Sequence, residues 1–182
     1  MKKIFILAAF MLAAVSSQAQ DVFKKGDNLV GAQIGIGSGL AASVTYERAV
    51  VDNLFDGKGS IGVGGYLGYL HDKDSYKMEG FEAGWKYDDI IVGARGNLHY
   101  QFIDRLDTYA GLMLGYEIVN AKVYGKGFDG ESMTGLNADA DASGFAFSIH
   151  VGTRYYFTEN FAAGVELGYG VSYANVGIAY KF

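Results

Sequence analysis

The sequence predicts an all-β protein, an eight-stranded antiparallel up-and-down transmembrane β-barrel, on three observations. Apolar side chains recur at every second position in eight separate segments, which is the period of a strand that faces two different environments. Glycine and aromatic residues are abundant, with 27 Gly, 14 Tyr and 12 Phe, whereas Pro and Cys are absent. A chain without Pro suits ladders in which every N–H is paired. No apolar run after residue 20 reaches the roughly 20 residues that a membrane-spanning helix needs.

The first 19 residues have the composition of a Sec signal peptide. Two lysines and an apolar run from Ile4 to Val15 precede the small-x-small sequence at 17–19, so we expect cleavage after Ala19. The predicted division is therefore a signal peptide at 1–19 and an outer-membrane barrel domain at 20–182. Removing the signal peptide takes away two of the 15 basic residues and none of the 20 acidic ones. The mature chain is acidic, which excludes nucleic acid as a partner.

The first three predicted strands place small or polar residues opposite an apolar face. Residues 30–37, 42–47 and 60–69 alternate Val, Ile, Leu, Ala or Tyr on one face with Gly, Ser, Thr, Gln33 or Glu47 on the other. A strand in a soluble core would bury its apolar face. A transmembrane barrel does the reverse, with lipid outside and a polar lumen inside.

The fourth predicted strand, residues 90–102, decides between these two readings. Its apolar face opposes Arg95, Asn97, His99 and Gln101. No soluble core would accept four such residues on its buried side, because each would lose its hydration. The alternative of a secreted lipocalin-like barrel, with apolar residues inside, is therefore disfavoured.

The next three predicted strands, residues 110–118, 144–157 and 163–170, keep the same phase. Their outward positions are Ala, Leu, Ile, Val, Phe and Tyr, and glycine fills much of the inward face. The inward positions that carry polar or charged side chains include Glu117, Ser148, His150, Arg154 and Glu166.

The eighth predicted strand lies within residues 171–182, with Lys181 inward and an aromatic at the carboxyl end. It resembles the closing strand of bacterial outer-membrane β-barrels, in which the terminal aromatic is part of the assembly signal. The resemblance implies that Tyr180 and Phe182 carry this signal here, and that the barrel-assembly machinery is a partner.

The connections alternate in length as the topology requires. Short turns at 103–106 and 158–160 are expected on the periplasmic side, and long loops at His71 to Asp89 and Val119 to Ala142 outside. The connection at Val51 to Lys58 is longer than a periplasmic turn should be. Two girdles of aromatic residues are expected, one at each membrane interface. The periplasmic girdle consists of Tyr100, Phe102, Tyr155, Phe157, Tyr180 and Phe182, and the outer one of Tyr69, Tyr116, Phe145 and Tyr169.

Taken with the Gly-rich inner face and Phe182, these features resemble the small outer-membrane barrel proteins related to the OmpA transmembrane domain and to OmpX. The likeness extends over nearly the whole mature chain. It implies the cell outer membrane of a Gram-negative bacterium, and contact with outer-membrane lipid and lipopolysaccharide.

An eight-stranded barrel is just wide enough to be filled by its own side chains, so the lumen should be closed. A charge-balanced polar network is expected inside, and Arg154 should reach Glu166 on the neighbouring strand. No cofactor or metal is predicted. The predicted lumen residues are Glu47, Arg95, His99, Glu117, Ser148, His150, Arg154, Glu166 and Lys181.

Two other functions remain as alternatives. The first is a small-solute porin or ion channel that uses the lumen. The second is a lipid A-modifying enzyme, because Ser148 and His150 share a face and Glu166 lies on the next strand. Such an active site must meet lipid, whereas these side chains should point into the lumen, so no catalytic residue is predicted.

The two long loops are the predicted functional surface. They combine many acids with aromatic side chains, which supply apolar contact area and select against anionic partners. We expect a structural and surface-interaction role, with a host or surface protein ligand, or metal-bridged lipopolysaccharide, as the partner. The candidate contact residues are Tyr76, Phe81, Trp85, Tyr87, Tyr124 and Phe128.

Overall fold

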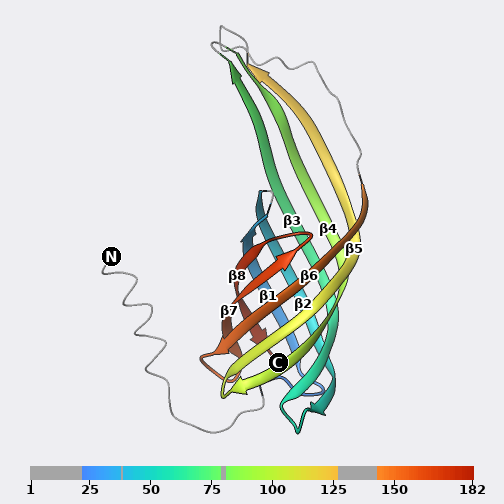
Figure 1. The fold of residues 1–182 in the computed structure, drawn as a ribbon, viewed down its shortest axis with the longest axis vertical. Coiled ribbons are helices and arrows are strands. Elements are labelled where there is room, and N and C mark those ends of the chain that lie inside the picture. The colour runs from blue at the N-terminus through green and yellow to red at the C-terminus, as the bar shows by residue number, and fades with distance from the viewer. Residues whose placement is uncertain (1–21, 38, 79–80, 127–142) are drawn as a thin grey trace, which may run out of the picture.

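The computed structural model describes residues 22–37, 39–78, 81–126 and 143–182, and the predicted signal peptide lies outside them. These residues form a closed antiparallel barrel of eight strands. Each strand pairs with its neighbours in sequence, and the first pairs with the last (Figure 1). The predicted eight-stranded up-and-down architecture is confirmed.

The strands differ greatly in length. β3, β4 and β5 have 20, 23 and 21 residues, whereas β1, β7 and β8 have only 9, 9 and 8. The bounds are β1 (Asn28–Ile36), β2 (Leu40–Leu54), β3 (Gly59–Met78), β4 (Phe81–Ile103), β5 (Leu106–Lys126), β6 (Gly144–Tyr156), β7 (Phe161–Tyr169) and β8 (Ala174–Lys181). Figure 1 shows β3, β4 and β5 rising beyond the rim that the other strands form. We call the end with the short connections the turn end, and the opposite end the projecting end.

The inward and outward faces follow the predicted phase. On the outer face, the apolar side chains of Val92 and Leu112 are 54% and 57% exposed. On the inner face of β4, Arg95, Asn97 and His99 are all buried. Apolar outside and charged inside is the inverse of a soluble protein, and it follows directly from the period-two pattern of each strand.

The lumen is not uniformly polar. At the turn end an apolar cluster includes Phe23, Leu29 and Tyr156, and towards the projecting end a second one is built from Ile91 and Met113. Leu29 is paired with Glu47, and Met113 with Arg95, in the strand register. Apolar and charged side chains therefore lie at the same levels of the barrel interior.

Glycine on the lumen face makes room for polar side chains. A Cβ added at Gly111 would overlap the side-chain oxygen of Asn97 and approach His150 Nε2 to 2.8 Å. A Cβ at Gly62 would overlap the carboxylate of Glu47. The inward glycines are therefore a packing requirement of the polar lumen, as the sequence predicts.

The connection predicted at Val51 to Lys58 is shorter in the structure. β2 continues to Leu54 and β3 begins at Gly59, so the turn is a tight one, and register shifts after Ala49 absorb the extra residues. Phe55 and Asp56 adopt left-handed backbone angles, with φ of 52° and 59°. The β2–β3 connection is therefore short, like the other connections at the turn end.

The described parts of the two predicted long loops are strand rather than loop, which corrects that expectation: 71–78 and 81–89 of the first and 119–126 of the second, whose remainder lies outside the described residues. β3 and β4 stay paired up to Met78 opposite Phe81, and β5 stays paired with β4 up to Lys126 opposite Glu82. The sequence criterion was apolar alternation, which stops where the outer face no longer needs to be apolar. Backbone pairing does not depend on apolar side chains, so the strands continue.

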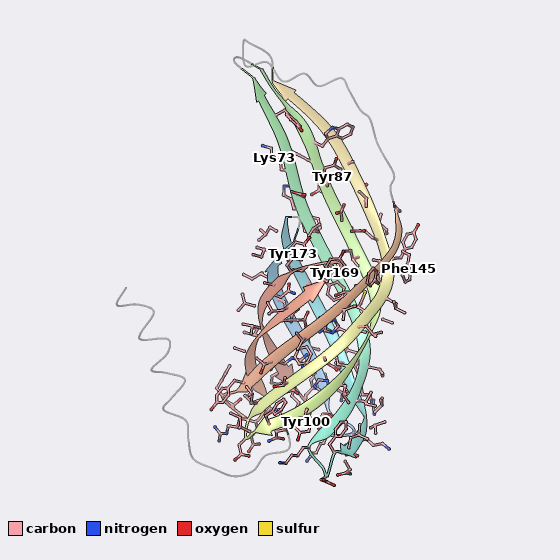
Figure 2. The ribbon with its side chains drawn as sticks, viewed as in Figure 1. Lys73, Tyr87, Tyr100, Phe145, Tyr169 and Tyr173 are labelled. Atoms are coloured by element: carbon pink, nitrogen blue, oxygen red, sulfur yellow. The ribbon has the colours of Figure 1, made fainter. Side chains whose placement is uncertain are left out.

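Aromatic side chains gather at the turn end as predicted. The rings of Tyr100 and Phe102 lie 4.6 Å apart, and those of Tyr180 and Phe182 lie 6.1 Å apart. Phe161, which was not predicted, contacts Tyr180 at 4.8 Å. Figure 2 labels Tyr100 at this end, with Phe145 and Tyr169 much nearer the other rim.

Candidate functional site

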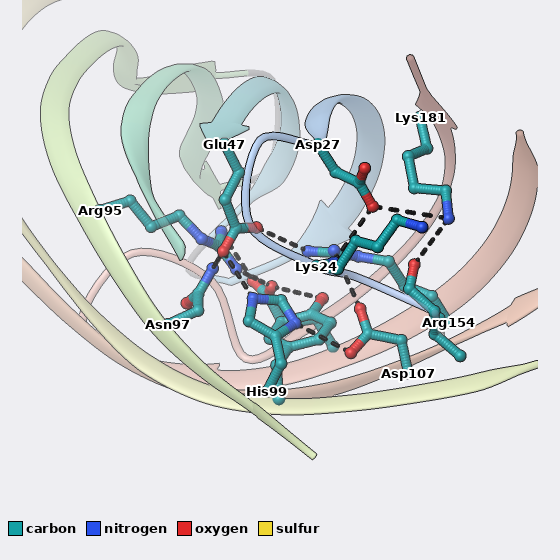
Figure 3. A network of polar contacts seen from close by, with 12 residues as sticks. Lys24, Asp27, Glu47, Arg95, Asn97, His99, Asp107, Arg154 and Lys181 are labelled. Atoms are coloured by element: carbon teal, nitrogen blue, oxygen red, sulfur yellow. Dashed lines mark hydrogen bonds and ion pairs between the residues drawn. The ribbon is translucent and has the colours of Figure 1, made fainter. Parts of the chain in front are cut away.

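The central feature of the lumen is a ring of four charged side chains, which we call the quartet: Glu47, His99, Asp107 and Arg154. His99 Nε2 lies 2.6 Å from Glu47 Oε1, and His99 Nδ1 lies 2.8 Å from Asp107 Oδ1. Arg154 spans the same two carboxylates, donating to Glu47 Oε2 at 3.4 Å and to Asp107 Oδ2 at 3.3 Å (Figure 3). The four residues come from β2, β4, β5 and β6, so the quartet ties together half of the barrel wall.

The geometry of the quartet suits a charge-neutral group of two cations and two anions. Carboxylates only accept hydrogen bonds when ionised, so His99 satisfies both of its carboxylate neighbours when both ring nitrogens donate. Glu47 is 2% exposed and also accepts a hydrogen bond from Asn97 Nδ2 at 2.8 Å. Buried charges persist when each has a partner with good geometry, and here each has at least two.

A second group lies beside the quartet. Arg95 pairs with Glu166 through both terminal nitrogens, and Tyr109 donates its hydroxyl to Glu166 Oε2 at 2.9 Å. The Tyr109 ring lies between the two guanidinium groups, 4.1 Å from that of Arg154 and 5.8 Å from that of Arg95. Tyr109 thereby connects the two charged groups through cation–π contacts.

The predicted pairing of Arg154 with Glu166 is wrong. The register is as expected, with Arg154 opposite Gly164. The guanidinium instead pairs with Asp107, directly opposite on the adjacent strand β5, and reaches across the lumen to Glu47 on β2, while Arg95 pairs with Glu166. Counting along β6 and β7 alone missed both contacts, because one partner lies on the other neighbouring strand and the second lies on a strand that is not a neighbour.

The remaining predicted lumen residues occupy different places. His150 Nε2 lies 2.7 Å from Asn97 Oδ1, so this nitrogen is engaged by the amide and not by Ser148. Ser148 is buried on the same strand, and Glu117 is half-buried near the projecting end. Lys181 lies outside the quartet, at the turn end, where it donates to the carbonyl of Val22 at 2.9 Å.

Sequence reasoning missed Asp107 and Tyr109. The fifth strand was predicted to begin at Ala110, but β5 begins at Leu106 and both residues continue its inward phase. Extending the predicted alternation from Ala110 back by three residues, towards the expected turn, would have identified both of them.

Little space remains beside Arg95, His150 and Arg154. Two voids of about 10 Å³ each touch the network, and one of them is lined by Arg95, Ser148, His150 and Ser172. Arg95 Nε and His150 Nδ1, both of which belong to lining residues, have no hydrogen-bond partner among the described residues. A void of this size holds about one water molecule.

The strands at the projecting end form the second candidate site. Tyr76 is 83% exposed, and Trp85 stacks with Tyr87 at a ring distance of 6.5 Å. Phe81 and Tyr124 lie within described strands, but their side chains are outside the description, as is all of Phe128. Figure 2 shows Tyr87 and Lys73 well beyond the rim near Tyr169 and Tyr173.

The acidic and aromatic residues of this sheet are divided between its two faces, and Asp88 lies on the outward face, where it contacts Tyr69 and His71. Tyr87 and Asp89 continue the inward phase of β4, whereas Lys73 and Lys86, paired across β3 and β4, are exposed on the opposite face. The register places Lys122 beside Lys86 in the same row. The sequence pattern did not reveal this lysine row, because it becomes apparent only from the strand register.

Asp89 lies just beyond the outer aromatic positions and has an unusual environment. Its burial raises its pKa to about 6, and the nearby charges of Glu117, Asp88 and Asp72 act in the same direction. One rim carboxyl therefore titrates well above the ordinary range of aspartate.

Two backbone edges of the projecting sheet lack a partner within the described part of the chain. β2 pairs with β3 only as far as His71, and β6 pairs with β5 only as far as Glu117. Beyond these points, the outer edges of β3 up to Met78 and of β5 up to Lys126 have no neighbouring described strand. Unpaired edges are templates for an additional strand.

Among the residues that the structure describes, no helix is long and apolar enough to cross a membrane. Nor does that part of the chain contain a group of three or more His, Asp or Glu side chains arranged to hold a metal ion.

No family model and no curated protein sequence matches the chain. Among solved structures, similar chains include the Yersinia pestis attachment invasion locus protein Ail, in complex with the heparin analogue sucrose octasulfate. It has 11% identity and a TM-score of 0.45, and the match covers 87% of this chain and 99% of Ail. The N-terminal β-barrel domain of Pseudomonas aeruginosa OprF has 17% identity and a TM-score of 0.48, with 87% and 98% covered. Neisserial surface protein A has 12% identity and a TM-score of 0.42, with 85% and 93% covered. At these identities the likeness concerns the fold alone.

Proposed function

We propose that the protein is an integral outer-membrane barrel with a closed lumen, whose projecting sheet binds a partner at the cell surface. The observation that carries the first half is the inverted distribution of polarity. An apolar, exposed outer face surrounds a buried group of paired charges, and lipid is the environment that such a surface requires. The predicted signal peptide supplies the route of export.

Heat-modifiability tests the membrane barrel. The mature chain, folded in detergent, should migrate differently on a gel before and after boiling, and its circular dichroism should show strand without helix. A water-soluble monomer with one unchanged gel position would contradict a membrane barrel.

The carboxyl terminus supports assembly by the barrel-assembly machinery. Phe182 exchanges backbone hydrogen bonds with Asn28, N–H to carbonyl in both directions at 2.9 Å, and so completes the junction of β1 with β8. Tyr180 lies beside it on β8. Deleting Phe182 should lower the yield of assembled barrel in cells, while an equal yield would remove Phe182 from the assembly signal.

The binding role rests on the outer edges of β3 and β5, which have no neighbour among the described strands of the projecting sheet. An extended segment of a host or surface protein can add to the edge of β3 or β5 through main-chain hydrogen bonds, while alternate side chains contact the aromatic face at Trp85 and Tyr87. The lysine row on the opposite face adds a polar surface towards lipopolysaccharide. A relation to the OmpA and OmpX barrels fits this arrangement.

Trimming the sheet in register tests the binding role. Replacing residues 73–86 by a two-residue Asn-Gly turn keeps Asp72 opposite Tyr87 and leaves the barrel pairs below unchanged. Heat-modifiability should persist, and adhesion of whole cells to protein-coated surfaces should fall to the level of cells without the protein. Undiminished adhesion by the trimmed protein would contradict the proposed surface.

A non-enzymatic role is part of the proposal. Ser148 and His150 face the lumen, and His150 already contacts Asn97, so neither side chain meets a lipid substrate. Lipid A from cells with and without the protein should be identical by mass spectrometry. A modification that disappears in Ser148→Ala would favour the enzyme alternative, and large stable conductances in planar bilayers would favour the porin.

A further inference from the structure

The segment before β1 crosses the mouth of the barrel at the turn end. Residues 22–27, which we call the N-terminal strap, form no strand of the barrel wall, yet Val22 and Phe23 are buried. The Phe23 ring packs against the His99 ring at 4.6 Å. One aromatic side chain of the strap therefore lies directly against the quartet.

The strap is fastened to the wall at its beginning and at its end. At its beginning, the Val22 N–H donates to Gln101 Oε1 at 3.2 Å, and the Val22 carbonyl accepts from Lys181 Nζ at 2.9 Å. At its end, Asp27 lies 3.7 Å from Lys181 Nζ, and its carbonyl accepts from the Ala49 N–H at 3.0 Å. Lys181 thus holds both ends of the strap at once, as Figure 3 shows for Asp27.

A polar hollow of about 240 Å³ lies between the strap and the wall. Its lining includes Phe23 and Lys24 of the strap, Ser60 of β3, and His99 and Asp107 of the quartet. The voids deeper in the barrel are only about 10 Å³ each. The hollow at the turn end is therefore much larger than these two voids, and the strap forms part of its boundary.

We infer that the N-terminal strap is a removable closure that controls access from the periplasm to the hollow and to the His99 side of the quartet. The orientation follows from the proposed membrane insertion, but the closure itself does not depend on what the projecting sheet binds. The strap is suited to release because it is held by side-chain contacts and a few turn hydrogen bonds rather than by a β-ladder. Its side-chain attachment includes the buried Phe23 ring and the contacts of Lys181 with Val22 and Asp27.

Cysteine accessibility tests the closure without background, because the chain contains no cysteine. Ser60 lines the hollow, is 3% exposed and differs from cysteine by one atom. In Ser60→Cys, a polar thiol reagent should react slowly with the folded mature protein in detergent. Adding Phe23→Gly should raise the labelling rate at least tenfold, because the ring that covers the quartet is removed.

A second variant tests whether Lys181 holds the strap in place. Lys181→Met in the Ser60→Cys background releases Val22 and Asp27 together and should also accelerate labelling, whereas Lys181→Arg should keep the rate low. Phe55→Ala is the matched control, since Phe55 is an exposed aromatic of the same end that lies outside the hollow. Its labelling rate should equal that of the parent.

Ser148→Cys reports on the other side of the quartet. It should stay slow to label with and without Phe23, because the paired charges still separate it from the hollow. Fast labelling of Ser60→Cys in the intact protein, or an unchanged slow rate in both the Phe23→Gly and Lys181→Met variants with normal heat-modifiability, would overturn the inference.

Discussion

The same three strands behave differently in the barrel and beyond it. Inside the barrel, β3, β4 and β5 lie in a closed ladder, and the charges of the quartet are paired with one another in the lumen. Beyond His71 and Glu117, the outer edges of β3 and β5 have no neighbour among the described strands, and aromatic rings of the sheet are exposed. The lengths of β2 and β6, rather than any change in β3 to β5, determine where the enclosed anchor ends and the available surface begins.

The largest effect should come from breaking the quartet. Arg154→Ala leaves two buried carboxylates, Glu47 and Asp107, with His99 as their one shared cation in the quartet, which should lower the free energy of unfolding by about 3–5 kcal/mol. Urea unfolding of the protein in lipid vesicles measures this. Arg48→Ala is the control, because Arg48 follows Glu47 on β2 but is exposed, and it should cost less than about 0.5 kcal/mol. Equal costs would mean that the quartet does not stabilise the barrel.

Substitutions of two glycines compare the packing on the inner and outer faces of the barrel wall. Gly111→Ala inserts a methyl group into the Asn97 amide and should cost about 1–3 kcal/mol, since the lumen has no room to relax. At the outward Gly65, the nearest atom to an added Cβ is the Gly93 carbonyl at 3.9 Å, so Gly65→Ala should be tolerated. Thermal unfolding of both variants decides the point, and equal tolerance would show that the lumen is less tightly filled than described.

Removing a single hydroxyl should have a smaller effect. Tyr109→Phe deletes the hydrogen bond to Glu166 but keeps the ring between the two guanidinium groups, so a loss of about 1–2 kcal/mol is expected. Tyr116→Phe, on the exposed outer face, should be nearly neutral. The same urea titration compares them, and a neutral Tyr109→Phe would leave the stabilising role of Tyr109 to its ring alone.

The smallest expected effect is on the pH dependence of the free energy of unfolding, through Asp89 at the rim. Because burial and neighbouring acids raise the pKa of Asp89, the folded state binds this proton more tightly than the unfolded chain does. The free energy of unfolding should therefore fall as the pH rises from about 4 to about 6. Asp89→Asn should flatten this part of the profile, measured as urea midpoints at several pH values. A slope unchanged by the substitution would assign it to other groups.

The predictability of each feature follows from its physical origin. The inward and outward faces of β4 could be predicted because Arg95, Asn97 and His99 are too polar to face lipid. The partners of Arg154 could not, because Asp107 lay outside the predicted fifth strand and the contact with Glu47 across the lumen depends on how the sheet closes. The N-terminal strap has no periodicity, and the extensions of β3 to β5 lose the apolar signal while keeping their hydrogen bonds. Sequence patterning therefore identified the environment of each face but not the contacts within it.

The unequal strand lengths also have a consequence for how the molecule meets its surroundings. A barrel with an even rim looks alike from every direction in the membrane plane, whereas this one is high along β3 to β5 and low along β7, β8 and β1. In the proposed outer-membrane location, a neighbour that diffuses laterally would meet a tall wall on one flank and an open approach on the other. A complex formed at the wall would therefore fix the rotational orientation of the barrel about the membrane normal.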